Sequence, residues 1–240
     1  MTQGSFRFTF EALEAEYRAL LGLGYEVLTC ADFFRRKTVD LPPLALVNRV
    51  DIDLSVKKAE RLVSLFNRLN IKATFFLRLH AHEYNPFSFE SYRILRFVLD
   101  SGHELGYHSE IVDQAAIWGE DAAECLRRDI DVLNRMFGIR IAGTASHGGM
   151  TGLNNLDFWK NRDAAEFGLL YEGYDCSPRF NLFAESFYVS DSEWTRWKCY
   201  DKGRFVPDDR RSPAQHGADR HPLMHLLIHP DTYFDRHFYE

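Results

Sequence analysis

Alternating strand-like and helix-like stretches constrain the fold of this 240-residue chain more than any other feature. Strands are predicted at 44–47, 71–79, 104–108 and 140–145, and helices with one apolar face at 55–69, 89–99 and 120–137. A helix after each strand returns the chain to the same edge of the sheet, so successive strands run parallel. The pattern therefore predicts an α/β fold with a parallel sheet, either doubly wound or closed into a barrel.

The two ends and the last third of the chain give weaker signals. A first amphipathic helix is predicted at 9–23, and strands at 25–29, 169–174 and 223–228. Residues 154–167 favour a helix, and we interpret the polar stretch 191–218 as a surface excursion. No internal repeat or linker separates these parts, and the length suits one barrel, so we expect a single domain over 1–240.

Charge and composition exclude some classes of function. The chain has 29 basic and 35 acidic residues and a net charge of -6. This balance disfavours nucleic-acid binding, which depends on Lys and Arg neutralising phosphates. No stretch approaches the roughly 18–20 apolar residues that span a bilayer, and the N-terminus has no leader-like apolar core. We therefore expect a cytoplasmic protein without a membrane span.

The four cysteines are far apart and form no C-x-x-C pair: Cys30, Cys125, Cys176 and Cys199. Such spacing indicates neither a zinc knuckle nor a compact disulfide framework. We interpret them as reduced thiols in the core or at the surface, because free cysteine is often simply buried.

Two carboxylates, Asp51 and Asp53, follow the predicted strand 44–47. Side chains alternate along an extended backbone, so both can point into one pocket at the carboxyl edge of the sheet. One carboxylate can then hold a divalent metal while the other accepts a proton from water. Two alternatives stay open: Asp53 can cap the following helix, and a D-x-D pair also holds the cation in sugar-nucleotide glycosyltransferases.

A set of histidines favours hydrolysis over glycosyl transfer. His103, His108, His147 and His229 lie near the ends of later predicted strands, and a glycosyltransferase has no need of such a set. One histidine is more often structural than a ligand, but four near strand ends favour a site. The segment 22–24 (GLG) also lacks the third glycine of a phosphate-binding loop.

Four segments resemble, in order, the motifs of the NodB-homology polysaccharide deacetylases, a family of the carbohydrate esterase family 4 type. They are 48–53 (NRVDID), 70–76 (NIKATFF), 102–108 (GHELGYH) and 226–230 (LLIHP). The first is similar to the R-x-D-x-D motif of a divergent branch, and the family often has glycine where Asn70 stands. The resemblance implies a deformed (β/α) barrel of about seven strands, of the glycoside hydrolase/deacetylase type. It also implies hydrolysis of an N-acetyl or related amide on a carbohydrate.

Position by position, the resemblance implies roles for four residues. Asp51 matches the general base and Asp53 the carboxylate ligand of the metal. His108 matches the first histidine ligand, and His229 the general acid that protonates the departing amine. Imidazole suits the last role because its pKa lies close to working pH.

The chain departs from the family pattern at the second histidine ligand. The position four residues after His108 is Val112, which cannot coordinate a metal. Glu110, Asp113 and His147 are the substitutes within reach, and we favour His147 from the end of the next predicted strand. Two histidines and one carboxylate suit zinc, with iron, cobalt or nickel as alternatives.

Further residues are expected to support the reaction. The family usually has an arginine that orients the base, but the matching position is Thr144 or its neighbour, so Arg49 is predicted to tune Asp51. Backbone N–H groups of Gly148 and Gly149 are predicted to stabilise the oxyanion.

Residues outside the motifs are candidates for contacts with the substrate. His80 follows a predicted strand and either lines the substrate cleft or lies in a surface loop. The four tryptophans can stack on sugar rings, although most aromatic residues belong to cores: Trp118, Trp159, Trp194 and Trp197.

These observations predict a metal-dependent carbohydrate deacetylase that acts on a sugar precursor in surface-polysaccharide or O-antigen assembly. Two other functions stay open. One is a non-catalytic carbohydrate-binding or regulatory protein that binds no metal, because Val112 replaces the second histidine ligand. The other is a metal-free amidohydrolase of the same fold, acting on a small cyclic amide. Bound metal and sensitivity to chelators distinguish the three.

Overall fold

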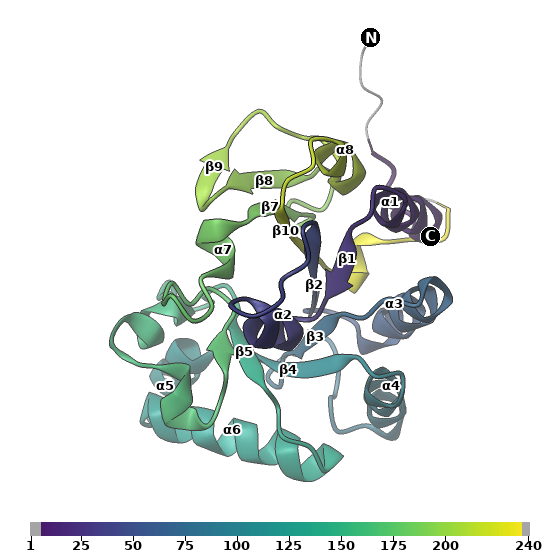
Figure 1. Cartoon of the computed structure of the whole chain (residues 1–240). Coiled ribbons are helices and arrows are strands. Elements are labelled where there is room, and N and C mark those ends of the chain that lie inside the picture. Colours follow the sequence, from purple (N-terminus) through teal and green to yellow (C-terminus); the bar gives the residue numbers. More distant parts are fainter. Residues whose placement is uncertain (1–5, 237–240) are drawn as a thin grey trace.

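The computed structural model describes residues 6–236, in which a ten-stranded sheet is surrounded by helices (Figure 1). Across the sheet the strands are β6 (Tyr171–Glu172), β5 (Gly143–Ser146), β4 (Glu104–Ser109), β3 (Thr74–Leu77), β2 (Ala45–Ile52), β10 (Leu223–Ile228), β7 (Phe187–Ser190), β8 (Lys198–Asp201) and β9 (Arg204–Val206). The remaining strand, β1 (Glu26–Leu28), pairs with the first half of β2. The α/β class predicted from the sequence is confirmed.

In this spatial order, the first seven strands, which begin with β6 and end with β7, all run parallel. Strands β8 and β9 continue the sheet in antiparallel pairing. Within residues 6–236 no pairing joins β6 to β9, so these two strands end the hydrogen-bonded ladder instead of closing a barrel. All eight residues of β2 are buried. Asp51 therefore lies inside this central strand, not beyond its end.

The helices begin and end at capping residues. They are α1 (Phe10–Gly22), α2 (Cys30–Arg36), α3 (Val56–Leu69), α4 (Phe89–Asp100), α5 (Ile111–Trp118), α6 (Ala122–Phe137), α7 (Leu182–Glu185) and α8 (Pro213–Ala218), with 3-10 helices η1 (Asn155–Asn161), η2 (Ala164–Phe167) and η3 (Pro230–Thr232). Side-chain oxygens of Ser55 and Asp121 accept backbone N–H bonds at the starts of α3 and α6. Asn70 ends α3 with a left-handed φ of 53°, a conformation that Gly and Asn tolerate best.

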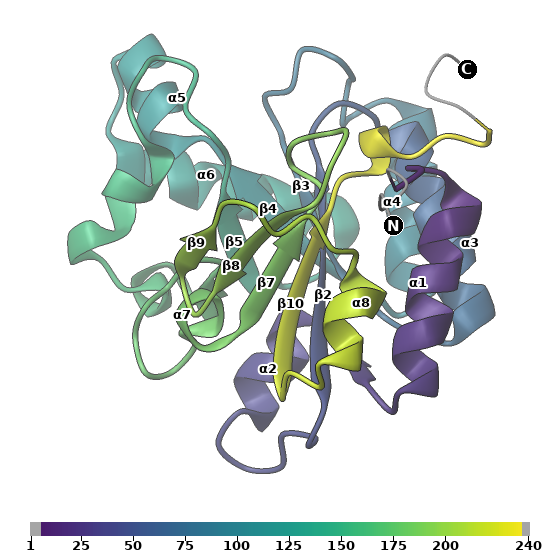
Figure 2. The same ribbon diagram turned by 90° about the horizontal axis from the view of Figure 1, so that it is seen from above.

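A helix covers the amino ends of the strands, whereas the carboxyl ends are not covered by this helix. Helices α3, α4 and α6 lie outside strands β3, β4 and β5 in Figure 1, and α1 lies beside α3 in Figure 2. Helix α2 covers the amino ends of the strands. Its Cys30 N–H donates to Thr74 Oγ1 at 2.8 Å, and Ala31 N–H donates to Glu104 Oε2 at 3.0 Å. The carboxyl ends therefore face the open side.

The structure corrects three predictions of local structure. Helices α2 and α5 were not predicted, and the helix predicted at 154–167 is the two short 3-10 helices η1 and η2. The surface excursion predicted at 191–218 is wrong, because this segment contains β8, β9 and α8 and its Asp191 and Trp197 are fully buried. Among residues 6–236, no helix has both the length and the apolar character needed to cross a bilayer.

Candidate active site

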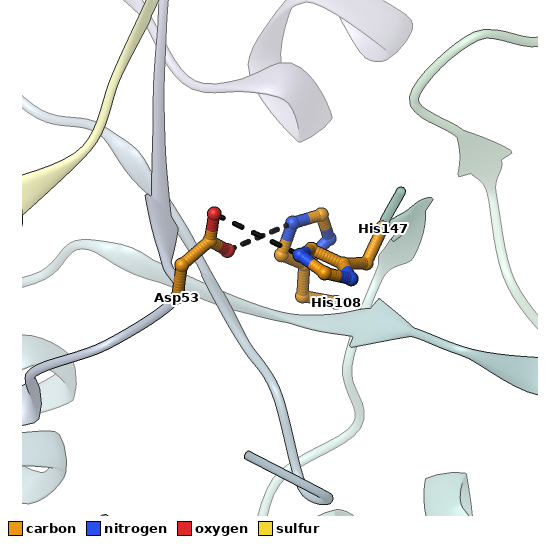
Figure 3. Close-up of side chains that lie close together, drawn as sticks. All are labelled: Asp53, His108 and His147. Carbon is orange, nitrogen blue, oxygen red and sulfur yellow. Dashed lines mark ion pairs between the residues drawn. The ribbon is translucent and has the colours of Figure 1, made fainter. Parts of the chain in front are cut away.

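The carboxyl ends of β2, β4, β5 and β10 surround a cavity of about 310 Å³. Its lining includes eight residues singled out from the sequence: Arg49, Asp51, Asp53, His108, His147, Gly148, Trp194 and His229. Three strands contribute the central group, because Asp53 follows β2, His108 lies in β4 and His147 follows β5 (Figure 3). Residues more than 90 positions apart in sequence order thus meet as expected for a parallel sheet, where functional groups gather at the carboxyl edge.

Asp53, His108 and His147 have ligand atoms that all lie within 4.8 Å of one another. Nε2 of His108 is 3.3 Å from Asp53 Oδ1, and Nε2 of His147 is 3.8 Å from Asp53 Oδ2 (Figure 3). Asp53 Oδ1 is buried and accepts no hydrogen bond from the described residues. Two imidazole nitrogens and a carboxylate oxygen are the donors that zinc prefers, so this group fits a divalent metal.

The second nitrogen of each histidine is held by a neighbouring group. Nδ1 of His108 lies 2.8 Å from the carbonyl oxygen of Ala145, to which it donates. Nδ1 of His147 lies at an ion-pair distance of 3.2 Å from Glu110 Oε1, and that oxygen accepts a hydrogen bond from Arg78 at 2.8 Å. Such contacts orient a histidine so that its free nitrogen faces the metal position. Glu110 is therefore placed to orient His147 and is not itself in the ligand group.

Asp51 is paired with Arg49 inside the sheet. The guanidinium donates from Nε to Oδ1 at 2.8 Å and from NH2 to Oδ2 at 2.7 Å, and both side chains are buried. Burial by itself raises the pKa of Asp51, but the charges of Arg49 and His108 outweigh it, so the pKa falls below its usual value. Arg49 thus touches the residue that it was predicted to tune. Asp51 is ionised at neutral pH.

His229 is held by Asp191, a residue that sequence reasoning missed. The backbone N–H of His229 donates to Asp191 Oδ2 at 2.9 Å, and its Nδ1 lies 2.5 Å from Oδ1. Burial lowers the pKa of His229, but the Asp191 charge raises it to about 9. Nε2 of His229 faces the cavity, 3.7 Å from Asp53 Oδ2. The available signal was the apolar run 187–189 that ends in Ser190-Asp191, the same strand-then-acid pattern as at Asp53.

The loop after β5 owes its shape to Asp113, which was named as a possible metal ligand. Asp113 is not in the ligand group, and both of its carboxylate oxygens accept bonds from the loop and from η1. The donors are Met150 N, Thr151 N, Thr151 Oγ1 and Asn155 Nδ2. Gly148 lines the cavity. Gly149 has no room for a side chain, since a Cβ there would lie 1.8 Å from the carbonyl oxygen of Leu153.

Two other predicted histidines lie outside the site. His80 does not line the cavity: its Nε2 is 3.1 Å from Asp129 on α6, and its ring packs edge-on against Trp118. His103 lies just before β4, at the amino end of that strand, where Nδ1 accepts the N–H of Ala73. Of the tryptophans only Trp194 lines this cavity.

Comparisons with known proteins give distant matches. The chain is similar to a chitin deacetylase from the fungal pathogen Colletotrichum lindemuthianum, with 16% identity over 45% of this chain and 46% of that chain and a TM-score of 0.34. The chain thus matches less than half of that deacetylase's length. It is also similar to the catalytic domain of peptidoglycan N-acetylglucosamine deacetylase from Eubacterium rectale, with 17% identity, coverage of 77% and 76%, and a TM-score of 0.45. No family model and no curated protein matches the sequence. The functional inference therefore depends on the site itself.

Proposed function

We propose that this chain is a metal-dependent hydrolase that removes an N-acetyl or related acyl group from a carbohydrate. One observation carries the proposal: Asp53, His108 and His147 converge beside two further buried pairs, Asp51 with Arg49 and His229 with Asp191. A metal-ligand group, an ionised carboxylate and a charged imidazole around one cavity are what hydrolysis of an amide requires.

The metal would be held by Asp53, His108 and His147. His147 would take the role of the family's second histidine ligand, because Val112 stands at that position in this chain. Zinc is the first candidate because of this donor set, with iron, cobalt or nickel as alternatives. When bound, the metal would supply Lewis-acid polarisation of the amide carbonyl and a lower pKa for the attacking water. Glu110 and the carbonyl of Ala145 would keep the two imidazoles in place.

Asp51 is the proposed general base, which takes a proton from the attacking water. Its pKa lies below the usual value because of Arg49, so it is ionised and ready to accept that proton at neutral pH. The two bonds from Arg49 also stop the carboxylate from rotating. We expect Arg49 to help by orienting the Asp51 carboxylate. It does not make Asp51 a stronger base, because that would require a raised pKa for Asp51.

His229 is the proposed general acid, which gives its Nε2 proton to the amine nitrogen as the C–N bond breaks. Asp191 holds Nδ1, so Nε2 faces the cavity, and a pKa of about 9 keeps the ring protonated at neutral pH. The acyl group leaves as a carboxylate. Backbone N–H groups at Gly148 and Gly149 are the proposed donors to the oxyanion.

The rest of the cavity suits a sugar with an acylated amine. Its wall combines aromatic and polar side chains: Tyr174, Phe183, Tyr188, Trp194, Lys198 and Tyr200. Aromatic rings pack on the apolar faces of sugar rings while hydroxyl and ammonium groups bond their polar edges. A cytoplasmic precursor in surface-polysaccharide or O-antigen assembly stays the predicted substrate, from the motif resemblance.

Metal analysis and acetate release test the proposal together. The purified chain is expected to carry metal and to release acetate from at least one of a panel of N-acetylated hexosamines and their oligomers. A chelator should abolish the release, and added zinc should restore it. Asp51→Asn should keep the metal and lose turnover, whereas Asp53→Asn should lose both.

Two outcomes would contradict it in different ways. A chain without metal that shows only sugar binding would be a non-catalytic carbohydrate-binding protein. Turnover that resists the chelator and survives Asp53→Ala better than Asp51→Ala would indicate a metal-free amidohydrolase.

A further inference from the structure

A second group of metal-ligating side chains lies away from the cavity, on β8 and the segments that follow it. Cys199 comes from β8, Asp209 from the loop after β9, and His216 from α8. Side chains alternate along a strand, and the neighbours Lys198 and Tyr200 line the active-site cavity. Cys199 therefore points to the opposite face of the hairpin.

The spacing of the three ligand atoms suits one tetrahedral ion. All three lie within 4.8 Å of one another, with Cys199 Sγ 3.4 Å from His216 Nε2 and that nitrogen 3.3 Å from Asp209 Oδ1. Zinc bonds of about 2.3 Å to sulfur and 2.0–2.1 Å to nitrogen or oxygen give tetrahedral edges of about 3.5 Å and 3.3 Å. The observed separations match these edges without a change of fold.

His216 is buried without a strong hydrogen bond, which an ion would remedy. The side chains of Cys199 and His216 are fully buried. Among the described residues Nδ1 of His216 has no hydrogen-bond partner. Its Nε2 lies beyond the usual 2.7–3.2 Å of an N–H···O bond from Asp209, and a thiol is only a weak partner. A metal bond would give Nε2 the strong partner that it lacks, and the proton of the neutral ring would then lie on Nδ1.

Arg211 also binds both carboxylate oxygens of Asp209. The guanidinium donates from Nε to Oδ1 at 3.1 Å and from NH2 to Oδ2 at 2.8 Å, and the backbone N–H of Arg211 donates to Oδ1 at 3.0 Å. Because Oδ1 has two lone-pair positions, a bond from Oδ1 to an ion would replace the longer of its two bonds, the one from Nε. The same arginine bonds Asp219 at 2.7 Å. Arg211 therefore orients Asp209 toward His216 and offsets part of the charge of the acidic side chains.

We propose that Cys199, Asp209 and His216 bind a structural divalent cation of the zinc type, with water in the fourth position. On binding, Cys199 loses its S–H proton to solvent and a sulfur–metal bond forms. The ion ties β8, the loop after β9 and α8 together. It thereby fixes the wall of the cavity that carries Lys198 and Tyr200. This site is separate from the proposed catalytic metal and does not depend on it.

Cobalt substitution tests the site directly, because sulfur bonded to Co(II) gives a charge-transfer band in the near ultraviolet. The proposed catalytic group contains no sulfur, so the band reports on Cys199 alone. The band is expected to be complete at one Co(II) per chain in reduced, metal-free Asp53→Asn, which lacks the proposed catalytic group, and at no more than two Co(II) in the parent chain. Cys199→Ser should abolish it. Cys176→Ser, which changes an exposed thiol, and Asp53→Asn should both retain it.

Zinc-dependent melting provides a second measurement in case Cys199→Ser does not fold. In an Asp53→Asn background, zinc should raise the melting temperature of the chain, and His216→Gln should remove that rise. The proposal is overturned if the folded chain shows no band with Co(II), or if the band survives Cys199→Ser. It is also overturned if zinc leaves the melting temperature of the Asp53→Asn chain unchanged. A parent chain that develops the Co(II) band but hydrolyses no amide would instead contradict the proposed catalytic function.

Discussion

Two walls of the active-site cavity differ in how they are built. The first consists of the ends of the parallel strands β2, β4 and β5, and it carries Asp51, Asp53, His108 and His147. The second consists of the segment after β7 and the antiparallel strand β8, and it carries Trp194, Lys198 and Tyr200. The first wall carries the proposed metal ligands and the proposed general base. The second holds the proposed general acid, His229 at the end of β10, through Asp191 and shapes the space for a substrate.

The difference shows how chemistry and selectivity are divided between regular and irregular structure. Parallel strands bring their carboxyl ends together whatever the loops contain, so ligands from distant positions meet with little adjustment. The second wall needs specific contacts, such as the bond of Asp191 to His229 or the packing of fully buried Trp197. We therefore expect changes in the first wall to abolish the reaction and changes in the second to weaken it.

The largest effect is expected from Asp53→Asn in the first wall. An amide oxygen is a weaker ligand than a carboxylate, so the group of Asp53, His108 and His147 should lose its metal. Hydrolysis should fall to background, and metal content by mass spectrometry should fall with it. Asp100→Asn, at an exposed position at the end of α4, serves as the control and should change neither. Full activity of Asp53→Asn would remove Asp53 from the ligand set.

A smaller loss is expected from Asp191→Asn in the second wall. Asn keeps the size of the side chain but removes the charge that holds His229 protonated. The rate should fall by about 10²-fold, at the low end of what general acid catalysis contributes, while bound metal stays unchanged. Asp208→Asn, an exposed change in the same segment, is the control. A loss of metal in Asp191→Asn would mean that the two walls do not act separately.

The first wall could be predicted from the sequence far better than the second. Helical and strand periods placed the parallel strands, and the D-x-D spacing and histidines at 108 and 229 marked the positions that the structure brings together. His147 was favoured over Asp113 and Glu110 because it follows a predicted strand, where the third motif of the resembled family lines the pocket, and because imidazole suits zinc. The roles of these residues stay predictions until activity is measured.

What could not be predicted depends on contacts between distant positions. Asp191 bonds a residue 38 positions later, and no local pattern distinguishes it from a solvated acid. Glu110 lies two positions before Val112 and Asp113 directly follows it, yet Glu110 contacts His147 and Asp113 holds the loop at Met150. Polar composition hid β8 and β9, because antiparallel strands with one exposed face have few apolar residues.

Adjacent glycines in the first wall provide a sharper test of its loop. A Cβ at Gly149 would overlap the carbonyl oxygen of Leu153, whereas a Cβ at Gly148 would meet nothing within 4 Å. Gly149→Ala should therefore displace the loop after β5 and destabilise the fold by up to about 3 kcal/mol, as overpacking does. Gly148→Ala is the matched control and should melt like the parent. Equal melting temperatures for the two variants would show that the loop is free to move.

A smaller, pH-dependent effect is expected at His225, which lies on β10 between the two walls. Its side chain is fully buried beside Tyr188, and among the described residues neither ring nitrogen has a hydrogen-bond partner. Burial, with a contribution from the Arg49 charge, lowers the pKa of His225 to about 3. The unfolded chain takes up a proton near pH 6.5 while the folded chain does not. Stability therefore falls as the pH drops from about 6.5 toward 3, by roughly 1.4 kcal/mol per unit.

Urea unfolding at pH 7 and pH 5 measures this effect. His225→Leu should reduce the loss of stability between the two pH values by about 2 kcal/mol, because leucine takes up no proton in the unfolded chain. His82→Leu is the control, since the His82 side chain is 81% exposed. An unchanged pH dependence in His225→Leu would mean that the folded protein accommodates the charged ring. In that case the interior between the two walls would be less apolar than the burial of His225 indicates.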